Sequence, residues 1–134
     1  GLAGDAAKWS LPLGLFGELR EGDEGFDLKR GSLLVVAVAR LAALEAGSSA
    51  GRTLDRLREA APVLGDDAAT LAEAFRYLTS LRLELAFDPA RRGAGSSGHR
   101  IHLAHLNVLE RRFLKDIFTL LRGVQKGLDS RYAL

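Results

Sequence analysis

The sequence predicts an all-α fold, an up-and-down bundle of about five helices that pack around one central buried helix. Three observations support this class. Alanine, leucine and arginine are abundant while β-branched residues are sparse, a composition that favours helices. Apolar residues recur at spacings of three and four over long stretches, and the alternation typical of strands is nowhere sustained. Loops rich in glycine or serine separate these stretches.

The first expected helix is short and runs from Pro12 to Leu19. Proline suits a first helical turn because its missing N–H would have no partner there. The apolar side chains of this segment are Leu13, Leu15, Phe16 and Leu19. Residues 20–26 are acidic and rich in glycine, which predicts a loop.

The second helix is expected from Leu28 to Ala46, and Gly47 is a good C-terminal stop. Its middle is apolar on every side, which is typical of a helix in the centre of a bundle. A buried β-strand is the competing interpretation for residues 33–38. The alanines and the continuation of the apolar pattern through Leu44 favour the helix.

Two further helices are expected after a loop at residues 48–51. Thr53 is the predicted N-cap of a short helix through about Ala61, and Pro62 helps to end it. The next helix is expected over residues 67–87, with Asp66 or Asp67 as its cap. The spacing of its apolar residues places one set on a single face, namely Leu71, Phe75, Leu78, Leu81 and Leu85.

The last helix is expected to start after Asn107 and to run to about Arg131, following a loop over residues 88–98. Asn107 and Glu110 have the spacing of a capping box, in which each side chain accepts a hydrogen bond from the other residue's backbone N–H. The predicted core stripe of this helix comprises Leu109, Phe113, Ile117, Leu120, Val124 and Leu128.

Composition and charge exclude several classes of protein. The chain has no cysteine, which excludes disulfides, thiolate zinc sites and a cysteine nucleophile. With 19 basic and 17 acidic residues it lacks the excess charge of a dedicated nucleic-acid binder. Its longest apolar stretch, residues 33–39, is far shorter than the roughly 18 residues of a membrane span. Because it begins at Gly1 and shows no signal peptide, we expect a cytoplasmic domain, residues 1–134, excised from a larger protein.

Two motifs of common catalytic sites are absent. The sequence contains no phosphate-binding Gly-x-x-x-x-Gly-Lys loop and no Asp-x-Asp or Asp-x-Glu pair. His99, His102 and His105 lie at intervals of three, but only two of them could share a helical face and no carboxylate completes the set. We therefore expect these histidines in a solvated loop, and neither a catalytic residue nor a metal ligand in this domain.

Basic side chains in unusual positions are the candidate ligand-binding residues. Arg40 interrupts the most apolar helix, and Arg82 lies between two leucines. Lys29 and Arg30 are at the start of a helix, where a cation opposes the helix dipole. An anionic ligand would explain these four residues, and so would ion pairs with Asp27, Glu45 or Glu84.

A second basic group lies on one side of the last helix, opposite its apolar stripe. Its members are Arg111, Lys115, Arg122 and Lys126. A phosphate-binding stripe and ordinary solvent exposure are both compatible with this arrangement.

A set of strings in the sequence is similar to one protein family. They are Pro12-Leu-Gly-Leu-Phe-Gly17, Asp27-Leu-Lys-Arg-Gly31, Val38-Ala-Arg-Leu-Ala-Ala-Leu-Glu-Ala-Gly47, Thr53-Leu-Asp-Arg-Leu, Leu71-Ala-Glu-Ala-Phe-Arg-Tyr-Leu78 with Leu81-Arg-Leu83, and Leu109-Glu-Arg-Arg-Phe-Leu-Lys-Asp116. Taken in order over residues 11–131, they resemble the C-terminal "putative nucleotidyltransferase substrate-binding" domain. That domain occurs in bacterial signal-transduction proteins with cyclic-nucleotide-binding, CBS and nucleotidyltransferase domains, which are similar to protein-PII uridylyltransferases.

The resemblance implies a non-catalytic accessory domain beside a nucleotidyltransferase domain of the same chain. The parent enzyme would use Mg2+ and a nucleoside triphosphate, whereas this domain would hold no cofactor and would help to bind nucleotide or an acceptor protein. The matching basic residues are Lys29, Arg30, Arg40, Arg82, Arg111 and Arg112. Of these, Lys29, Arg40 and Arg82 would meet phosphate or an acidic acceptor surface. Residues 101–107 depart from the family's Asp-Pro-rich approach to the last helix.

Two other functions are compatible with the sequence. One is a structural or dimerisation module that relays signals between regulatory domains and the transferase. The other is a helical nucleic-acid-binding domain, which the near-neutral charge disfavours. Neither a membrane nor a nucleic acid is therefore an expected partner.

Overall fold

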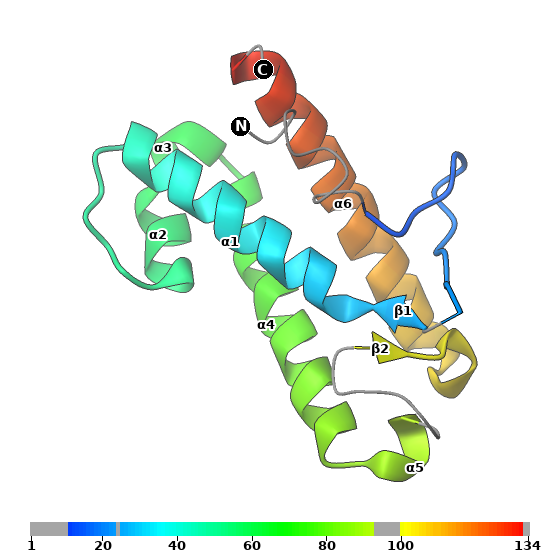
Figure 1. Cartoon of the computed structure of the whole chain (residues 1–134). Coiled ribbons are helices and arrows are strands. Elements are labelled where there is room, and N and C mark those ends of the chain that lie inside the picture. Colours follow the sequence, from blue (N-terminus) through cyan, green and yellow to red (C-terminus); the bar gives the residue numbers. More distant parts are fainter. Residues whose placement is uncertain (1–10, 24, 93–99, 133–134) are drawn as a thin grey trace.

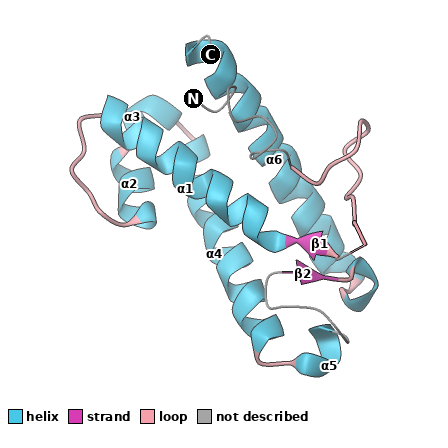
Figure 2. Cartoon of the chain, viewed as in Figure 1, coloured by secondary structure: helices cyan, strands magenta, loops and turns pink. Residues whose placement is uncertain are grey.

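The three longest helices form the body of the molecule, with α1 lying across α4 and α6 beside both (Figure 1). This computed structural model describes residues 11–23, 25–92 and 100–132. The elements in that part of the chain are β1 (Phe26–Asp27), α1 (Leu28–Glu45), α2 (Thr53–Glu59), α3 (Ala61–Leu64), α4 (Asp67–Ala86), α5 (Pro89–Arg92), β2 (Arg100–Ile101), a 3-10 turn (Leu103–His105) and α6 (Val108–Tyr132). The prediction of an all-α fold is confirmed, since the only described strands form one short antiparallel pair beside α1 (Figure 2).

Helix α1 begins and ends where the sequence predicts. The side chain of Asp27 accepts a hydrogen bond from the backbone N–H of Lys29 at 3.0 Å and so caps the first turn. At the other end Gly47 takes a positive φ of 76°, and the N–H of Ser48 reaches the carbonyl of Ala43 at 2.9 Å, as in a Schellman motif. The strand interpretation of residues 33–38 is therefore wrong.

Helices α4 and α6 approach α1 at Gly31. A Cβ atom on this glycine would lie 2.9 Å from the ring of Phe118 on α6 and 3.0 Å from a methyl group of Leu78 on α4. The ring of Phe118 also packs edge-on against Phe26, with centroids 5.1 Å apart. The hydrophobic core is built around this contact, because α1 turns most of its apolar residues towards it.

One strip of α1 faces solvent, which corrects the expectation of a helix buried on every side. Leu33 and Leu44 are exposed on this strip, and Arg40 lies between them. Helix α1 packs against α2, α3, α4 and α6, and these helices cover only the other sides. They do not surround α1 completely, so the apolar pattern overstated its burial.

The next two predicted helices exist, but the cap predicted for the first of them is wrong. Arg52 has extended backbone angles and takes the N-cap position of α2, so Thr53 is already helical. Pro62 lies in the first turn of α3 instead of ending α2, because a first-turn residue needs no N–H partner. Asp66 takes the N-cap position of α4 as predicted, but its side chain makes no capping hydrogen bond. The predicted buried face of α4 is confirmed, with only Phe75 of its five residues partly exposed.

The helix predicted over residues 12–19 does not form. The segment folds back on itself, since the N–H of Gly14 reaches the carbonyl of Glu18 and the N–H of Arg20 reaches that of Pro12, both at 2.8 Å. Gly17, with φ of 79°, makes the turn. The apolar side chain of Phe16, beside this turn, is 91% exposed. Of the loop expected over residues 88–98, the described part contains the single helical turn α5, and residues 93–98 lie outside the described residues.

Helix α6 is capped as predicted but buries a different strip. The N–H of Asn107 donates to Glu110 at 3.0 Å and the N–H of Glu110 donates to Asn107 at 2.8 Å, which confirms the capping box. The fully buried apolar side chains of the helix centre are Leu114, Phe118 and Leu121, whereas of the six predicted core residues only Leu128 is buried. The predicted stripe lies beside the buried one, because α6 is rotated about its axis so that Phe118 faces α1.

An ion-pair network ties the C-terminal end of α4 to the start of α6. Arg91 binds Glu84 at 2.9 Å and Glu110 at 2.6 Å. Burial alone would raise the pKa of Glu110, but the hydrogen bonds from Arg91 and from the backbone of Asn107 outweigh it and lower the pKa below its ordinary value of 4.5. No described helix combines the length and the apolar character that crossing a membrane requires.

Replacing Gly31 with valine tests the helix contact. We expect G31V to lower the free energy of unfolding by about 2 kcal/mol, since the new side chain must displace Phe118 or Leu78 from a packed core. Gly123 on α6 is the matched control, because a Cβ there meets nothing within 4 Å. G123A should therefore raise the stability by up to about 1 kcal/mol. Urea unfolding of both variants measures this, and equal effects of the two would contradict the close contact.

Replacing Glu110 with glutamine tests the network. E110Q keeps the hydrogen-bonding shape but loses the charge, so it should lower the stability at pH 7 by about 1 kcal/mol. Because the folded-state pKa is lowered, the stabilisation by the carboxylate is present above pH 4.5 and is lost as the pH falls through the folded-state pKa. The unfolding curves of wild type and E110Q should therefore converge in acid. A constant difference from pH 7 to pH 3 would contradict this, and the exposed E59Q serves as control.

Candidate functional site

The six basic residues predicted to bind substrate do not form one site. They are Lys29, Arg30 and Arg40 on α1, Arg82 on α4, and Arg111 and Arg112 on α6. Arg40 lies roughly 16 Å from Lys29 along the axis of α1, at a rise of about 1.5 Å per residue. Helices α1 and α4 cross near Gly31, and their C-terminal ends point away from each other (Figure 1). Arg40 and Arg82 are in these C-terminal halves and therefore lie apart. No single phosphate group can contact all six.

Two of the six basic residues have structural partners. Arg30 forms an ion pair with Asp27 at 3.6 Å, and Asp27 also pairs with Arg100 at 3.5 Å. An ion pair therefore explains the position of Arg30. Arg111 donates a hydrogen bond to the carbonyl of Leu106 at 2.6 Å. It therefore fastens the segment before α6 to that helix.

The stripe of basic residues on α6 is also partly structural. Arg122 donates to the carbonyl of Gly14 at 2.9 Å and holds the N-terminal turn against α6. Lys115 and Lys126 are exposed, as ordinary solvated residues are. A continuous phosphate-binding stripe along α6 is therefore not present, because Arg111 and Arg122 are used to fix backbone carbonyls.

The remaining predicted residues have no such partner. Among the described residues, the side chains of Lys29, Arg40, Arg82 and Arg112 make no hydrogen bond or ion pair. Arg82 is half-buried and the other three are exposed. Only Arg40 lies beside a second unneutralised arginine in a pocket, and it is the residue from which a candidate site can be built.

That pocket lies where α1 ends and α2 begins, and has a volume of about 290 Å3. Its polar lining comes from two arginines, Arg40 and Arg56, and two serines, Ser48 and Ser49. Alanine and leucine side chains complete it. No carboxylate is present among the seven lining residues, which are Arg40, Ala43, Leu44, Ser48, Ser49, Ala50 and Arg56.

Local hydrogen bonds give the pocket its shape. The Schellman turn at Gly47 sends the chain away from α1, and the Ser48 hydroxyl then accepts a hydrogen bond from the N–H of Ala50 at 3.1 Å. Arg56 donates from Nε to the carbonyl of Ala50 at 2.9 Å, which fixes the plane of its guanidinium group. The terminal nitrogens of Arg56 make no hydrogen bond with a described residue and remain available to a ligand.

This arrangement is suited to an anion that carries several oxygen atoms. Guanidinium groups bind phosphate through paired, charge-assisted hydrogen bonds, and serine hydroxyls can add further donors. Arg56 was missed as a candidate, because it lies on a short helix with many charged neighbours. The available signal was its position in the string Thr53-Leu-Asp-Arg-Leu, which belongs to the set that resembles the family.

The histidines form no metal site in the part of the chain that is described. His99 lies outside it, and the rings of His102 and His105 pack edge to face with centroids 5.7 Å apart. His102 approaches the carboxylate of Glu21 at 3.5 Å. Among the described residues, no three histidine, aspartate or glutamate side chains are placed to hold an ion.

One comparison with known proteins gave a match. A family model described as "Putative nucleotidyltransferase substrate binding domain" matches residues 1–132 of the chain. No significant match was found among curated proteins or among solved structures. The family match covers both the pocket at the end of α1 and all six predicted basic residues.

Proposed function

The chain belongs to this family of substrate-binding domains associated with nucleotidyltransferases, and on that premise we propose that it binds a phosphate-bearing substrate in the Arg40–Arg56 pocket. In this proposal it is a non-catalytic accessory domain of a bacterial signal-transduction protein. The catalytic step belongs to a nucleotidyltransferase domain of the same protein. That domain would hold Mg2+, since the described residues here include no cluster of carboxylates and histidines able to do so.

One observation carries the proposal, namely the two arginines that share a pocket without a carboxylate. Like charges at one site repel each other, and neither guanidinium group is neutralised by an ion pair with a described residue. A bound phosphate would remove this repulsion and would satisfy the unused N–H groups. Elsewhere on the same helix, Arg58 is paired with Asp55 at 3.1 Å, which is the usual arrangement for a structural arginine.

The roles of the other predicted residues follow from their positions. Three of these residues do not share a phosphate with Arg40. Lys29 is too far away along α1, whereas Arg82 and Arg112 lie on the other helices α4 and α6. We assign Lys29 and Arg82 to contacts with an acidic surface of the acceptor or of the catalytic domain. Arg30 and Arg111 are assigned to stabilising the fold, because their partners are backbone and carboxylate groups of this chain.

Thermal unfolding with added anions tests the pocket. We expect ATP, GTP, CTP or UTP with Mg2+, or inorganic tripolyphosphate, to raise the melting temperature by several degrees. Ligand at about 100 times its Kd adds roughly 2.7 kcal/mol of stability, which corresponds to such a shift. A shift with tripolyphosphate alone would identify phosphate as the recognised group, and a shift with one nucleotide only would show that the base is read as well.

Matched variants assign that shift to the pocket. R40A should abolish it without altering the loop, because Arg40 makes no hydrogen bond with a described residue. R56K keeps a positive charge but loses the fixed guanidinium plane, and should weaken binding by about tenfold. R58A, on the same helix, should leave the shift unchanged. The proposal fails if no anion gives a shift, or if R40A and R58A behave alike.

A further inference from the structure

A second hollow surface lies between α4 and α6, away from the arginine pocket. Two pockets of about 280 Å3 and 390 Å3 meet at Leu120, which lines both. On α6 they extend from Phe113 to Leu128, roughly 22 Å at about 1.5 Å per residue. Together they are referred to below as the α4–α6 groove, with α4 and α3 on one side and α6 on the other.

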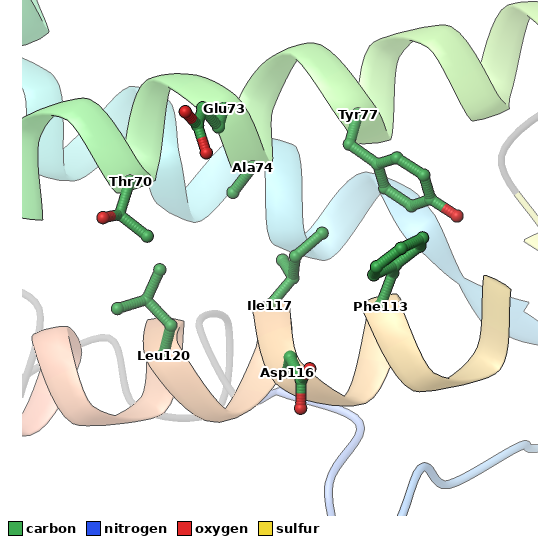
Figure 3. A pocket seen from close by; sticks show the side chains of 8 residues that line it. All are labelled: Thr70, Glu73, Ala74, Tyr77, Phe113, Asp116, Ile117 and Leu120. Atoms are coloured by element: carbon green, nitrogen blue, oxygen red, sulfur yellow. The ribbon is translucent and has the colours of Figure 1, made fainter. Parts of the chain in front are cut away.

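The inside of the groove is apolar. Figure 3 shows Ile117 and Leu120 of α6 pointing towards Ala74 and Thr70 of α4. At one end, the rings of Tyr77 and Phe113 meet edge to face with centroids 5.6 Å apart. Side chains bridge the two helices here, and the Arg91 network adds a link between the end of α4 and the start of α6. The two pockets lie along these bridging side chains.

Helix α6 carries more apolar surface than its own domain uses. Its buried strip faces α1, whereas Phe113 is 49% exposed and its neighbours along the groove are half-buried. These groove residues belong to the stripe that the sequence predicts as the core of the helix, at spacings of four, three and four: Phe113, Ile117, Leu120 and Val124. A stripe with this spacing is complementary to another helix lying along it.

Two glycines leave the α6 side of the groove without side chains at two positions. Gly123 and Gly127 are one turn apart on α6, and a Cβ on either would meet nothing within 4 Å. Glycine inside a helix costs about 1 kcal/mol relative to alanine, so the isolated domain gains nothing from them. Glycine does allow the backbone of another element to approach closely.

The rim of the groove is acidic on both sides. Figure 3 shows Glu73 on α4 and Asp116 on α6 flanking the apolar side chains, and Asp67 lines the other end. Neither pocket has a lysine or arginine among its lining residues. The whole chain has a net charge of +2, so this acidic rim differs from the rest of the molecule. An occupant would therefore need positive charges on both flanks of an apolar face.

We infer that the α4–α6 groove binds an amphipathic helix of a partner protein, about four turns long, whose apolar face is flanked by lysine or arginine. The described helices of this chain that exceed one turn pack against α1, so none of them is free to fill the groove. A second copy of the domain is disfavoured, because a symmetric pairing of two grooves would bring the acidic rims together. This inference does not depend on the phosphate pocket, which is lined by other residues, from α1, α2 and the turn between them.

Tyr77 adds one polar group at the end of the groove. Its hydroxyl is buried and has no hydrogen-bond partner within the described structure. Burial raises the pKa of Tyr77, and the carboxylates of Glu110 and Glu84 raise it further, so the hydroxyl stays protonated at neutral pH.

A pair of synthetic peptides tests the inference. Both form a four-turn helix with the same leucine and alanine face, and one has lysine flanks while the other has glutamate flanks. Titrated into isotope-labelled protein, the lysine peptide should shift the amide signals of Gly123, Gly127 and Phe113. The glutamate peptide should bind at least about tenfold more weakly.

Variants of the groove separate the contribution of charge to peptide binding from the contribution of shape. E73K with D116K should reverse the preference between the peptides, since both changes are on the rim and leave the core intact. The control, D23K with E59K, changes the net charge equally at exposed positions outside the groove and should leave the preference unchanged. G123L, which fills the groove without altering charge, should abolish binding of the lysine peptide.

Several outcomes would overturn the inference. One is equal affinity for the two peptides, and another is signal shifts located outside the groove. Binding of neither peptide would do so as well. Sedimentation of the protein alone gives a further check, because a dimer that G123L dissociates would assign the groove to a second copy of the chain.

Discussion

The contact of Gly31 with Phe118 and Leu78 is the constraint on which the rest of the structure depends. Only a residue without a side chain lets α4 and α6 both reach the backbone of α1 at this point. The contact fixes the rotation of α6, because Phe118 must face α1 and Phe26. It also fixes the divergence of α1 from α4, which separates the arginine pocket from Arg82.

The rotation of α6 divides its surface into three functional parts. One strip is buried against α1, the next is left half-exposed along the α4–α6 groove, and the polar side holds neighbouring segments in place. Arg111 and Arg122 perform this last role by donating to the backbone carbonyls of Leu106 and Gly14. Basic residues that look alike in the sequence thus differ in whether a ligand can reach an unused N–H group.

The two proposed surfaces recognise opposite charges. The pocket between α1 and α2 presents two arginines and no carboxylate, whereas the α4–α6 groove presents three carboxylates and no cation among its lining residues. A domain with this division can hold a phosphate-bearing molecule and a basic protein helix at the same time without competition. Such a property suits a substrate-binding domain that works beside a separate catalytic domain.

The sequence by itself determined the helical class, the bounds of α1, the buried face of α4 and the capping box of Asn107 and Glu110, because these depend on local periodicity and on groups a few residues apart. It could not determine which strip of α6 is buried, since two neighbouring apolar strips have the same period and only the contact at Gly31 chooses between them. Nor could it pair Arg40 with Arg56, which come together through the turn after α1. Side chains far apart in sequence meet only when packing sets the angles between helices, and that decision belongs to the tertiary structure.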